Sequence, residues 1–365
     1  NIVPKALTAT ASASNKVYNG NTTATTTLTL SGLIGSETLN SSNSSTFNNK
    51  NVGTNKDITV NTITLADGSN GGLAANYSIS AGQTTTAHIS PKSLTVSSIS
   101  SSNKIYDSSD AATTTLGLNG FIGSETLTNT NLSSFDNKNI GTSKTVTVNS
   151  ITLADGNNGG LAANYSINSG QTTTANITAK SITISGVTSA NKVYDGNAVA
   201  TLNTSSVLYS GLVAGDTFSG SYTGAFANAN VGTGKTVTIT SSYSGADVSN
   251  YNITSQSSTV ANIFVKSLTV SISSANKVYD AVNTATTSLT LSGLIGTETL
   301  NTSNTSTFNN KNVGSSKTVT VNSITLSNGS NGGLAANYSI SAGQTTTANI
   351  TAKALTVSGI TASNK

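Results

Sequence analysis

The sequence has 365 residues, of which only 8% are charged, and its formal net charge is +4. It contains no Cys, Met or Trp, and its 17 basic residues are all lysines that occur singly. Without cysteine the chain can form no disulfide framework, thiol nucleophile or thiolate metal site. Without clustered Lys and Arg it lacks the pattern of a nucleic-acid binder. The composition suits a secreted protein in oxidising surroundings.

The chain opens in the middle of a repeated pattern. Asn1 begins no charged and then apolar leader, and no apolar run approaches the roughly 20 residues that cross a bilayer. We therefore expect a mature or internal piece of a longer secreted protein, with no membrane-spanning segment.

Two motifs recur in one register along the chain. Lys-x-Leu/Ile-Thr returns about every 87 residues, beginning at Lys5, Lys92, Lys180, Lys266 and Lys353. Asn-Lys-Val/Ile-Tyr follows it, beginning at Asn15, Asn103, Asn191 and Asn276. A solenoid coil takes roughly 20 residues, so this period fits a whole small domain. The sequence predicts the end of a preceding repeat at 1–4, repeats at 5–91, 92–179, 180–265 (divergent, with a shortened loop) and 266–352, and the first strand of a fifth at 353–365.

Within each repeat, apolar residues alternate with Thr or Ser, as in half-buried β-strands. In the second repeat the alternation runs through residues 94–97 and again through Val146 and Val148. Ile151 and Leu153 continue the alternation at odd-numbered positions, whereas Val146 and Val148 are at even-numbered ones. This change of parity predicts a β-bulge or a tight turn near residues 149–150.

Turn pairs such as Asn-Gly and Asp-Gly separate these runs into seven or so short strands per repeat. This predicts an all-β fold, with each repeat an antiparallel, immunoglobulin-like sandwich. Residues 73–77, Leu-Ala-Ala-Asn-Tyr, could form a helical turn, so a β-grasp-like repeat with one short helix is the alternative. The joint at residues 175–184 contains no flexible Gly/Ser linker. We expect the repeats to form an extended, stiff rod.

A family resemblance appears in the third repeat. Residues 191–197, Asn-Lys-Val-Tyr-Asp-Gly-Asn, are followed by Ser-Gly-Leu-Val-Ala-Gly-Asp at 210–216 and by Asn-Tyr at 250–251. The pattern resembles the YDG-type repeat of large bacterial surface adhesins, including filamentous-haemagglutinin-like proteins, over residues 5–352. The resemblance implies secretion, surface display and a stalk or adhesive role, with no catalytic residues. The other repeats carry Tyr-Asn-Gly, Tyr-Asp-Ser and Tyr-Asp-Ala, which favours a turn over a chemical role for the tripeptide.

No residue set predicts a catalytic, cofactor or metal site. The single histidine, His88, aligns with asparagines in the other repeats. A hydrolase needs two converging carboxylates, whereas the acids fall in two separate columns. The first column is Glu37, Glu125, Asp216 and Glu298, and the second is Asp67, Asp155 and Asn328. The second lies in a Gly-rich loop that offers fewer charged ligands than calcium usually needs.

Eight tyrosines also form two columns, Tyr18, Tyr106, Tyr194 and Tyr279, and Tyr77, Tyr165, Tyr251 and Tyr338. We expect core anchors whose hydroxyls reach backbone groups, and a sugar-stacking set is the alternative. A self-made Lys–Asn crosslink is a further alternative. It would need a lysine of one column to meet an asparagine of another, the columns being Lys16, Lys104, Lys192 and Lys277, and Asn76, Asn164, Asn250 and Asn337.

The sequence therefore predicts a non-enzymatic extracellular repeat region of a large adhesin at the bacterial cell surface, acting as a stalk or adhesive rod. The alternative is a structural subunit of an ordered fibre, sheath or surface filament. Ice binding by threonine arrays fits less well, because β-strands twist. The expected partners are neighbouring copies of the chain, or host and cell-surface glycans or proteins, and no nucleic acid.

Overall fold

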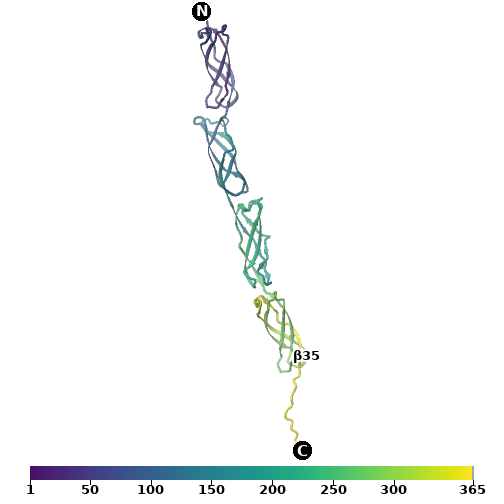
Figure 1. Cartoon of the computed structure of the whole chain (residues 1–365). Coiled ribbons are helices and arrows are strands. Elements are labelled where there is room, and N and C mark those ends of the chain that lie inside the picture. Colours follow the sequence, from purple (N-terminus) through teal and green to yellow (C-terminus); the bar gives the residue numbers. More distant parts are fainter. Residues whose placement is uncertain (364–365) are drawn as a thin grey trace. The chain divides into compact units, whose positions relative to one another are not determined.

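The computed structural model describes residues 1–363, and all of its long elements are β-strands. The chain divides into two compact units, Asn1–Lys180 and Ser181–Lys365, and each unit contains two repeats. Figure 1 shows the first unit in purple and blue and the second in green and yellow. Among residues 1–363 there is no helix with the length and apolar character needed to cross a membrane.

The first unit holds eighteen strands and two 3-10 turns, ten elements in each repeat. Those of the first repeat are β1 (Lys5–Ala6), β2 (Thr8–Ala13), β3 (Lys16–Val17), β4 (Thr23–Ala24), β5 (Thr26–Ser31), β6 (Leu39–Phe47), β7 (Gly53–Asp67), the 3-10 turn η1 (Ala74–Asn76), β8 (Tyr77–Ser78) and β9 (Thr84–Ser90). Those of the second are β10 (Lys92–Ser93), β11 (Thr95–Ser101), β12 (Lys104–Ile105), β13 (Ala111–Ala112), β14 (Thr114–Asn119), β15 (Leu127–Phe135), β16 (Gly141–Asp155), η2 (Ala162–Asn164), β17 (Tyr165–Ser166) and β18 (Thr172–Thr178).

The second unit follows the same order with changes in its first repeat. That repeat contains β19 (Lys180–Ser185), β20 (Thr188–Ser189), β21 (Lys192–Val193), β22 (Val199–Ala200), β23 (Leu202–Asn203), β24 (Leu208–Ser210), β25 (Ser219–Phe226), β26 (Gly232–Ser244), η3 (Val248–Asn250), β27 (Tyr251–Thr254) and β28 (Ser258–Phe264). The last repeat contains β29 (Lys266–Ser267), β30 (Thr269–Ser274), β31 (Lys277–Val278), β32 (Thr284–Ala285), β33 (Thr287–Ser292), β34 (Leu300–Phe308), β35 (Gly314–Asn328), η4 (Ala335–Asn337), β36 (Tyr338–Ser339) and β37 (Thr345–Thr351).

Each repeat is built on one five-stranded sheet, whose order in the first repeat is β3-β9-β7-β6-β4. The pair β2 and β5 is antiparallel, whereas β3 pairs with β9 and β1 with β8 in parallel. The all-β prediction is confirmed, but a purely antiparallel repeat is wrong at these two pairings. Parallel neighbours need a long connection between them, and most of the repeat lies between the two members of each pair.

The alternation seen in the sequence places one face of each long strand in the core. In β16, Val146 and Val148 are fully buried. The ladder with β15 then shifts, because Ser133 pairs with Val148 and Leu132 with Ser150, which leaves Asn149 unpaired. The predicted bulge is therefore confirmed, and the first and fourth repeats carry the same shift.

The helical turn expected at residues 73–77 is present as the single 3-10 turn η1. Its last residue, Asn76, leads directly into the short strand β8. In the third repeat the equivalent turn η3 has the sequence Val-Ser-Asn and begins after Asp247. A three-residue turn is the whole helical content of each repeat within the described chain.

Residues 353–363 form no strand, although a first strand of a fifth repeat is expected there. In each repeat the strand that begins with the motif lysine pairs with the strand that begins at the tyrosine after the 3-10 turn, as β29 does with β36. Residues 353–363 have no such partner strand in the described chain, and Leu355 is exposed. Asn364 and Lys365, which belong to the same prediction, lie outside the described residues.

Candidate functional site

The Asn-Lys-Val/Ile-Tyr segment forms a tight turn that its lysine closes. Lys192 Nζ lies 2.7 Å from the Asp195 carboxylate, donates to the carbonyl oxygens of Asn197 and Val199, and sits 5.8 Å from the centre of the Phe226 ring. Burial raises the pKa of Asp195, but the hydrogen bond from Lys192 and the Asn197 N–H outweigh it, so this pKa is lowered. The ammonium is therefore fully satisfied within its own turn.

The tripeptide after this lysine has the same backbone in every repeat. Its third residue lies in the left-handed region, with φ of +79° at Gly20, +67° at Ser108, +78° at Gly196 and +71° at Ala281. Its second residue is Asp or Asn, and Asn19 accepts a 2.9 Å hydrogen bond from the first-repeat lysine. Since all four versions of the tripeptide build one turn, the predicted turn role is confirmed.

The tyrosine of this turn is buried against the next repeat. Tyr18 is 1% exposed, and its ring packs edge-to-face on Tyr165 of the second repeat, with centres 5.5 Å apart. Tyr194 packs on Tyr338 of the fourth repeat in the same way, at 5.4 Å. The prediction of buried anchors is confirmed for these rings, and what they anchor is a joint between two repeats.

A glutamate of the next repeat accepts hydrogen bonds from the hydroxyls of both tyrosines. Glu125 accepts hydrogen bonds of 2.7 Å from Tyr18 Oη and from Tyr165 Oη. Tyr165 Oη in turn accepts the backbone N–H of Ile122 at 3.0 Å. The expected backbone partner is thus correct for Tyr165. It is wrong for Tyr18, whose buried O–H binds a carboxylate because the neighbouring repeat brings one into reach.

The joint of the second unit repeats these contacts. Tyr194 Oη and Tyr338 Oη donate to Glu298 at 2.6 and 2.7 Å, and Tyr338 Oη accepts the Ile295 N–H at 3.0 Å. Burial and the hydrogen bond to Glu298 raise the pKa of Tyr194 to about 12. Burial and the bond to Glu125 likewise raise the pKa of Tyr165 to about 12. Each carboxylate therefore holds two protonated phenols at neutral pH.

In the first unit a lysine completes the site. Lys50 Nζ lies 3.0 Å from Glu125 Oε1, and the carboxylate is only 7% exposed. Burial raises the pKa of Glu125, but the hydrogen bonds from Tyr165, Tyr18 and Lys50 together lower it below its usual range. The charged form of Glu125 is therefore the one that the joint stabilises.

The asparagine side chain of the Asn-Tyr pair forms hydrogen bonds with the preceding repeat. Asn164 is buried, and its Oδ1 accepts the N–H of Val52 in the preceding repeat at 2.9 Å while its Nδ2 donates to Asn51 at 3.1 Å. Asn337 makes the same two bonds to Val231 and Asn230. One amide side chain thus makes two hydrogen bonds to the preceding repeat at each joint.

Close approach at the joint also depends on glycine. A Cβ atom on Gly20 would lie 2.7 Å from Cγ2 of Ile122, and one on Gly196 would lie 2.8 Å from Cγ2 of Ile295. Both isoleucines belong to the following repeat. Ser108 and Ala281 adopt the same φ without glycine, so what Gly20 and Gly196 add at these joints is room for the neighbouring isoleucine side chain.

The sequence matches the YDG domain family four times, at residues 3–87, 90–175, 178–259 and 265–348. The chain belongs to the YDG domain family. None of the curated proteins matches it significantly. The four matches are tandem, and the joints described above lie between consecutive YDG repeats.

The remaining candidate residues have local roles in their YDG repeats. His88 Nδ1 accepts the N–H of Asn55 at 3.0 Å, as Asn176 Oδ1 does for Ser143 at 2.8 Å. Asp67 Oδ1 accepts the N–H of Ala74, the first residue of the 3-10 turn, at 2.7 Å. Asp155 and Asn328 do the same in the second and fourth YDG repeats.

The lysines and asparagines of the crosslink alternative lie in different contacts. Lys104 Nζ binds Asp107, Ser109 and the Ala111 carbonyl oxygen within its turn. Asn164 of the same YDG repeat binds Val52 and Asn51 of the preceding one. In the second repeat these two residues therefore bind different partners, which does not support a Lys–Asn crosslink between them.

Sequence reasoning missed the joint as a site. It considered the column of Glu125 only as a source of catalytic acids, rejected that role, and did not single out Lys50. The signal was present, because an acid recurs in one column of a chain with only 13 acidic residues. A recurring acid beside two tyrosine columns indicates a shared hydrogen-bond partner for their hydroxyls.

Proposed function

We propose that this chain is a non-enzymatic extracellular repeat region of a large bacterial surface adhesin, in which YDG repeats of immunoglobulin-like sandwich form act as a stalk or adhesive rod. The observation that carries the proposal is the joint. Two separate pairs of repeats use the same tyrosine pair, carboxylate and amide to lock one repeat onto the next.

A joint of this kind supports a spacer role because it fixes the orientation of one repeat on the next as well as their contact. The Tyr18 and Tyr165 hydroxyls must both reach Glu125, and Asn164 must reach the backbone of Val52. Buried hydrogen bonds left unmade cost about 1–3 kcal/mol each, so rotation or bending at the joint is opposed. Such a stalk can hold a binding region away from the cell that carries it.

The extracellular location is supported by composition. The chain has no Cys or Met to oxidise, and its low charge and threonine-rich strand faces are uniform over four repeats. Stability comes instead from buried tyrosines and hydrogen-bonded turns, which an oxidising medium leaves intact.

The proposal is tested on the bacterium that makes the protein. Antibodies raised against the purified chain should label intact cells, and deleting two repeats in frame should bring the label closer to the cell surface in electron micrographs. Labelling only after permeabilisation would overturn the proposal. A regular lateral lattice of the purified chain in negative stain would instead support the fibre or sheath alternative.

A further inference from the structure

In three of the four repeats the same polar cluster joins two neighbouring strands, at a place in the fold that we call the seam. In the second repeat Thr114, at the start of β14, meets Asn131 and Ser133 of β15. Its Oγ1 donates to Asn131 Oδ1 and lies 2.7 Å from Ser133 Oγ, and Asn131 Nδ2 donates to the Thr114 carbonyl oxygen at 3.2 Å. The first repeat has Thr26, Asn43 and Ser45 in these places, and the fourth has Thr287, Asn304 and Ser306.

The third repeat has none of these three residues. Counting back from the buried phenylalanine that ends β6 and β25, Tyr222 stands in the place of Asn43 and Gly224 in the place of Ser45. Counting on from the alanine that ends β4 and β22, Leu202 stands in the place of Thr26. In the third repeat the polar cluster is therefore replaced by the aliphatic side chain of Leu202, the aromatic ring of Tyr222, and Gly224, which has no side chain.

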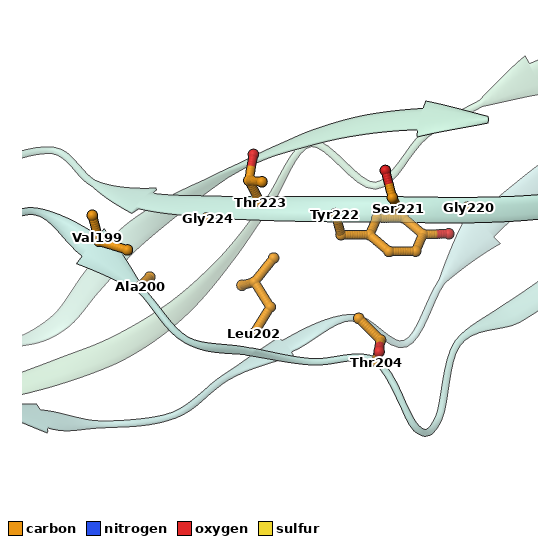
Figure 2. Close-up of a pocket in the computed structure, with 9 residues that line it drawn as sticks. All are labelled: Val199, Ala200, Leu202, Thr204, Gly220, Ser221, Tyr222, Thr223 and Gly224. Carbon is orange, nitrogen blue, oxygen red and sulfur yellow. The ribbon is translucent and has the colours of Figure 1, made fainter. Parts of the chain in front are cut away.

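A cavity of about 380 Å³ opens at this seam. Figure 2 shows Leu202 and Thr204 on one side and the Tyr222 ring on the other, lying along β25 in the direction of Gly220. Two glycines keep it open. A Cβ on Gly220 would lie 2.5 Å from Tyr222 Oη, and one on Gly224 would lie 2.7 Å from Leu202 Cδ2.

The edge of β25 beside the cavity carries free hydrogen-bonding groups of the backbone. Phe226 N–H points to this edge, since it donates to Ala198 O at 2.8 Å, and the N–H and C=O groups of alternate residues share an edge. Those of Tyr222 and Gly220 therefore point the same way. β22 covers the edge only at Ala225 and Gly224, and no ladder of residues 1–363 pairs with it beyond them.

The chemistry of the cavity selects a neutral, hydroxyl-bearing ligand. Its lining contains no charged side chain, but it does contain the Thr204 and Tyr222 hydroxyls and the open backbone edge. The Tyr222 ring is half-buried, so it offers an apolar surface to the C–H face of a ring. The volume lies near the lower end of the about 300–1,000 Å³ of small-molecule sites, which suits one ring.

We propose that the third repeat binds a single pyranose ring of a neutral glycan in this cavity. The ring stacks on Tyr222, and its hydroxyls bond to Thr204 and to the backbone of Gly220 and Tyr222. The other three repeats lack the site because their Thr–Asn–Ser cluster fills it. Binding does not depend on the stalk role, so a failed binding test leaves the proposed function standing.

The test uses the purified 365-residue chain and three probes, the methyl glycosides of mannose, galactose and N-acetylglucosamine. Saturation-transfer NMR should show at least one of them bound, with a Kd of about 1–10 mM as expected for a single ring. The triple variant Leu202→Thr, Tyr222→Asn, Gly224→Ser carries the residues of the other repeats and should bind at least tenfold more weakly. Ser219→Ala is the matched control, because Ser219 also lies on β25 but bonds to Ser244 and does not line the cavity, so its loss should change nothing.

Three outcomes would overturn the proposal. The first is no saturation transfer to any probe at about 50 mM, well above the expected Kd. The second is full binding by the folded triple variant. The third is binding of an extended Val-Thr peptide at this edge in place of the sugars, which would make it a strand-addition site. If the triple variant does not fold, Gly220→Ala, whose Cβ displaces the Tyr222 ring, should weaken binding instead.

Discussion

The two units contain the same kind of joint, but the residues beside its carboxylate differ in charge. In the first unit Lys50 forms an ion pair with Glu125, which is buried. In the second unit the residue aligned with Lys50 is Ala229, which packs among the apolar side chains of the joint, and Glu298 is half-buried. The tyrosine pair, the carboxylate and the amide are the same in both.

The difference separates what the joint requires from what adjusts it. The tyrosine pair and the carboxylate build the joint with or without a cation, so geometry and burial carry its specificity. A buried carboxylate without a partner is costly, and the lysine allows Glu125 to be less exposed than Glu298. Lys50 is therefore not required for the joint, but it permits deeper burial of the Glu125 carboxylate.

The largest expected effect comes from alkali, which attacks both joints. The pKa of Tyr165 and that of Tyr194 are raised from about 10 in the unfolded chain to about 12. The protonated phenols therefore stabilise the joints below pH 10, and this contribution is lost as pH rises through 12. Calorimetry from pH 8 to pH 12 should show it, with tyrosinate absorbance rising in parallel.

The control for alkali is Tyr194→Phe, which removes one ionising hydroxyl from the second joint only. Its unfolding transition for the second unit should depend less on pH above 10 than that of the native chain. An unchanged alkaline profile would mean that phenol ionisation at the joint is not what opens it.

Removal of one anchoring ring should have the next largest effect. Tyr194→Ala deletes a buried aromatic side chain and leaves Glu298 without one of its two donors, so we expect a loss of about 3 kcal/mol in the unfolding of the second unit. Hydrogen exchange should locate it, because the Val231 and Ile295 amides depend on the same joint.

Tyr279→Ala is the matched control for that ring, because the same motif residue is only half-buried in the fourth repeat. Its loss should be about 1 kcal/mol, typical of a partly exposed site. Equal losses for the two variants would show that the tyrosine stabilises its own repeat and not the joint.

The charge difference itself should produce a smaller effect. Lys50→Ala removes the cation from Glu125, but the lysine side chain is 39% exposed, so we expect a loss of about 0.5–1 kcal/mol at neutral pH. The lowered pKa of Glu125 means that its contribution is present above the unfolded pKa of about 4.3 and is lost as pH falls through the folded value. Without Lys50 that acid loss should begin at higher pH.

The reciprocal variant Ala229→Lys tests whether the second joint accepts the same addition. We expect it to bring a cation to Glu298 and to make unfolding of the second unit more sensitive to salt. If Lys50→Ala leaves the acid profile unchanged, the ion pair does not affect the joint.

The sequence predicted the parts of this fold that depend on local chemistry. The bulge at Asn149 followed from a change of parity, and the tight turns followed from Asn-Gly and Asp-Gly pairs. The parallel pairings and the joint did not follow, because their partners are far apart in sequence. Tyr18 meets Glu125 across 107 residues, and in a repeating chain each column member has equivalent partners in every other repeat.

The seam of the third repeat was hidden for a related reason. Its altered residues were visible as Tyr222, Gly224 and Leu202, but no local pattern says that these three lie together. Their aligned counterparts in the second repeat meet only because β14 and β15 lie side by side at that point. Comparison of repeats within one chain becomes informative once one of them has a structure.

The smallest expected effect is that of His88→Asn, at a position where the other three repeats have asparagine. His88 Nδ1 accepts the N–H of Asn55 at φ +51°, and Asn176 Oδ1 accepts that of Ser143 at φ +52°. His88→Asn should restore the same acceptor and change the free energy of unfolding by less than about 0.5 kcal/mol. His88→Ala removes it and should cost about 1 kcal/mol, the worth of one such bond. Urea unfolding of both variants decides the matter. A loss of more than about 1 kcal/mol in the free energy of unfolding of His88→Asn would show that the imidazole makes a stabilising contact that the asparagine amide cannot replace.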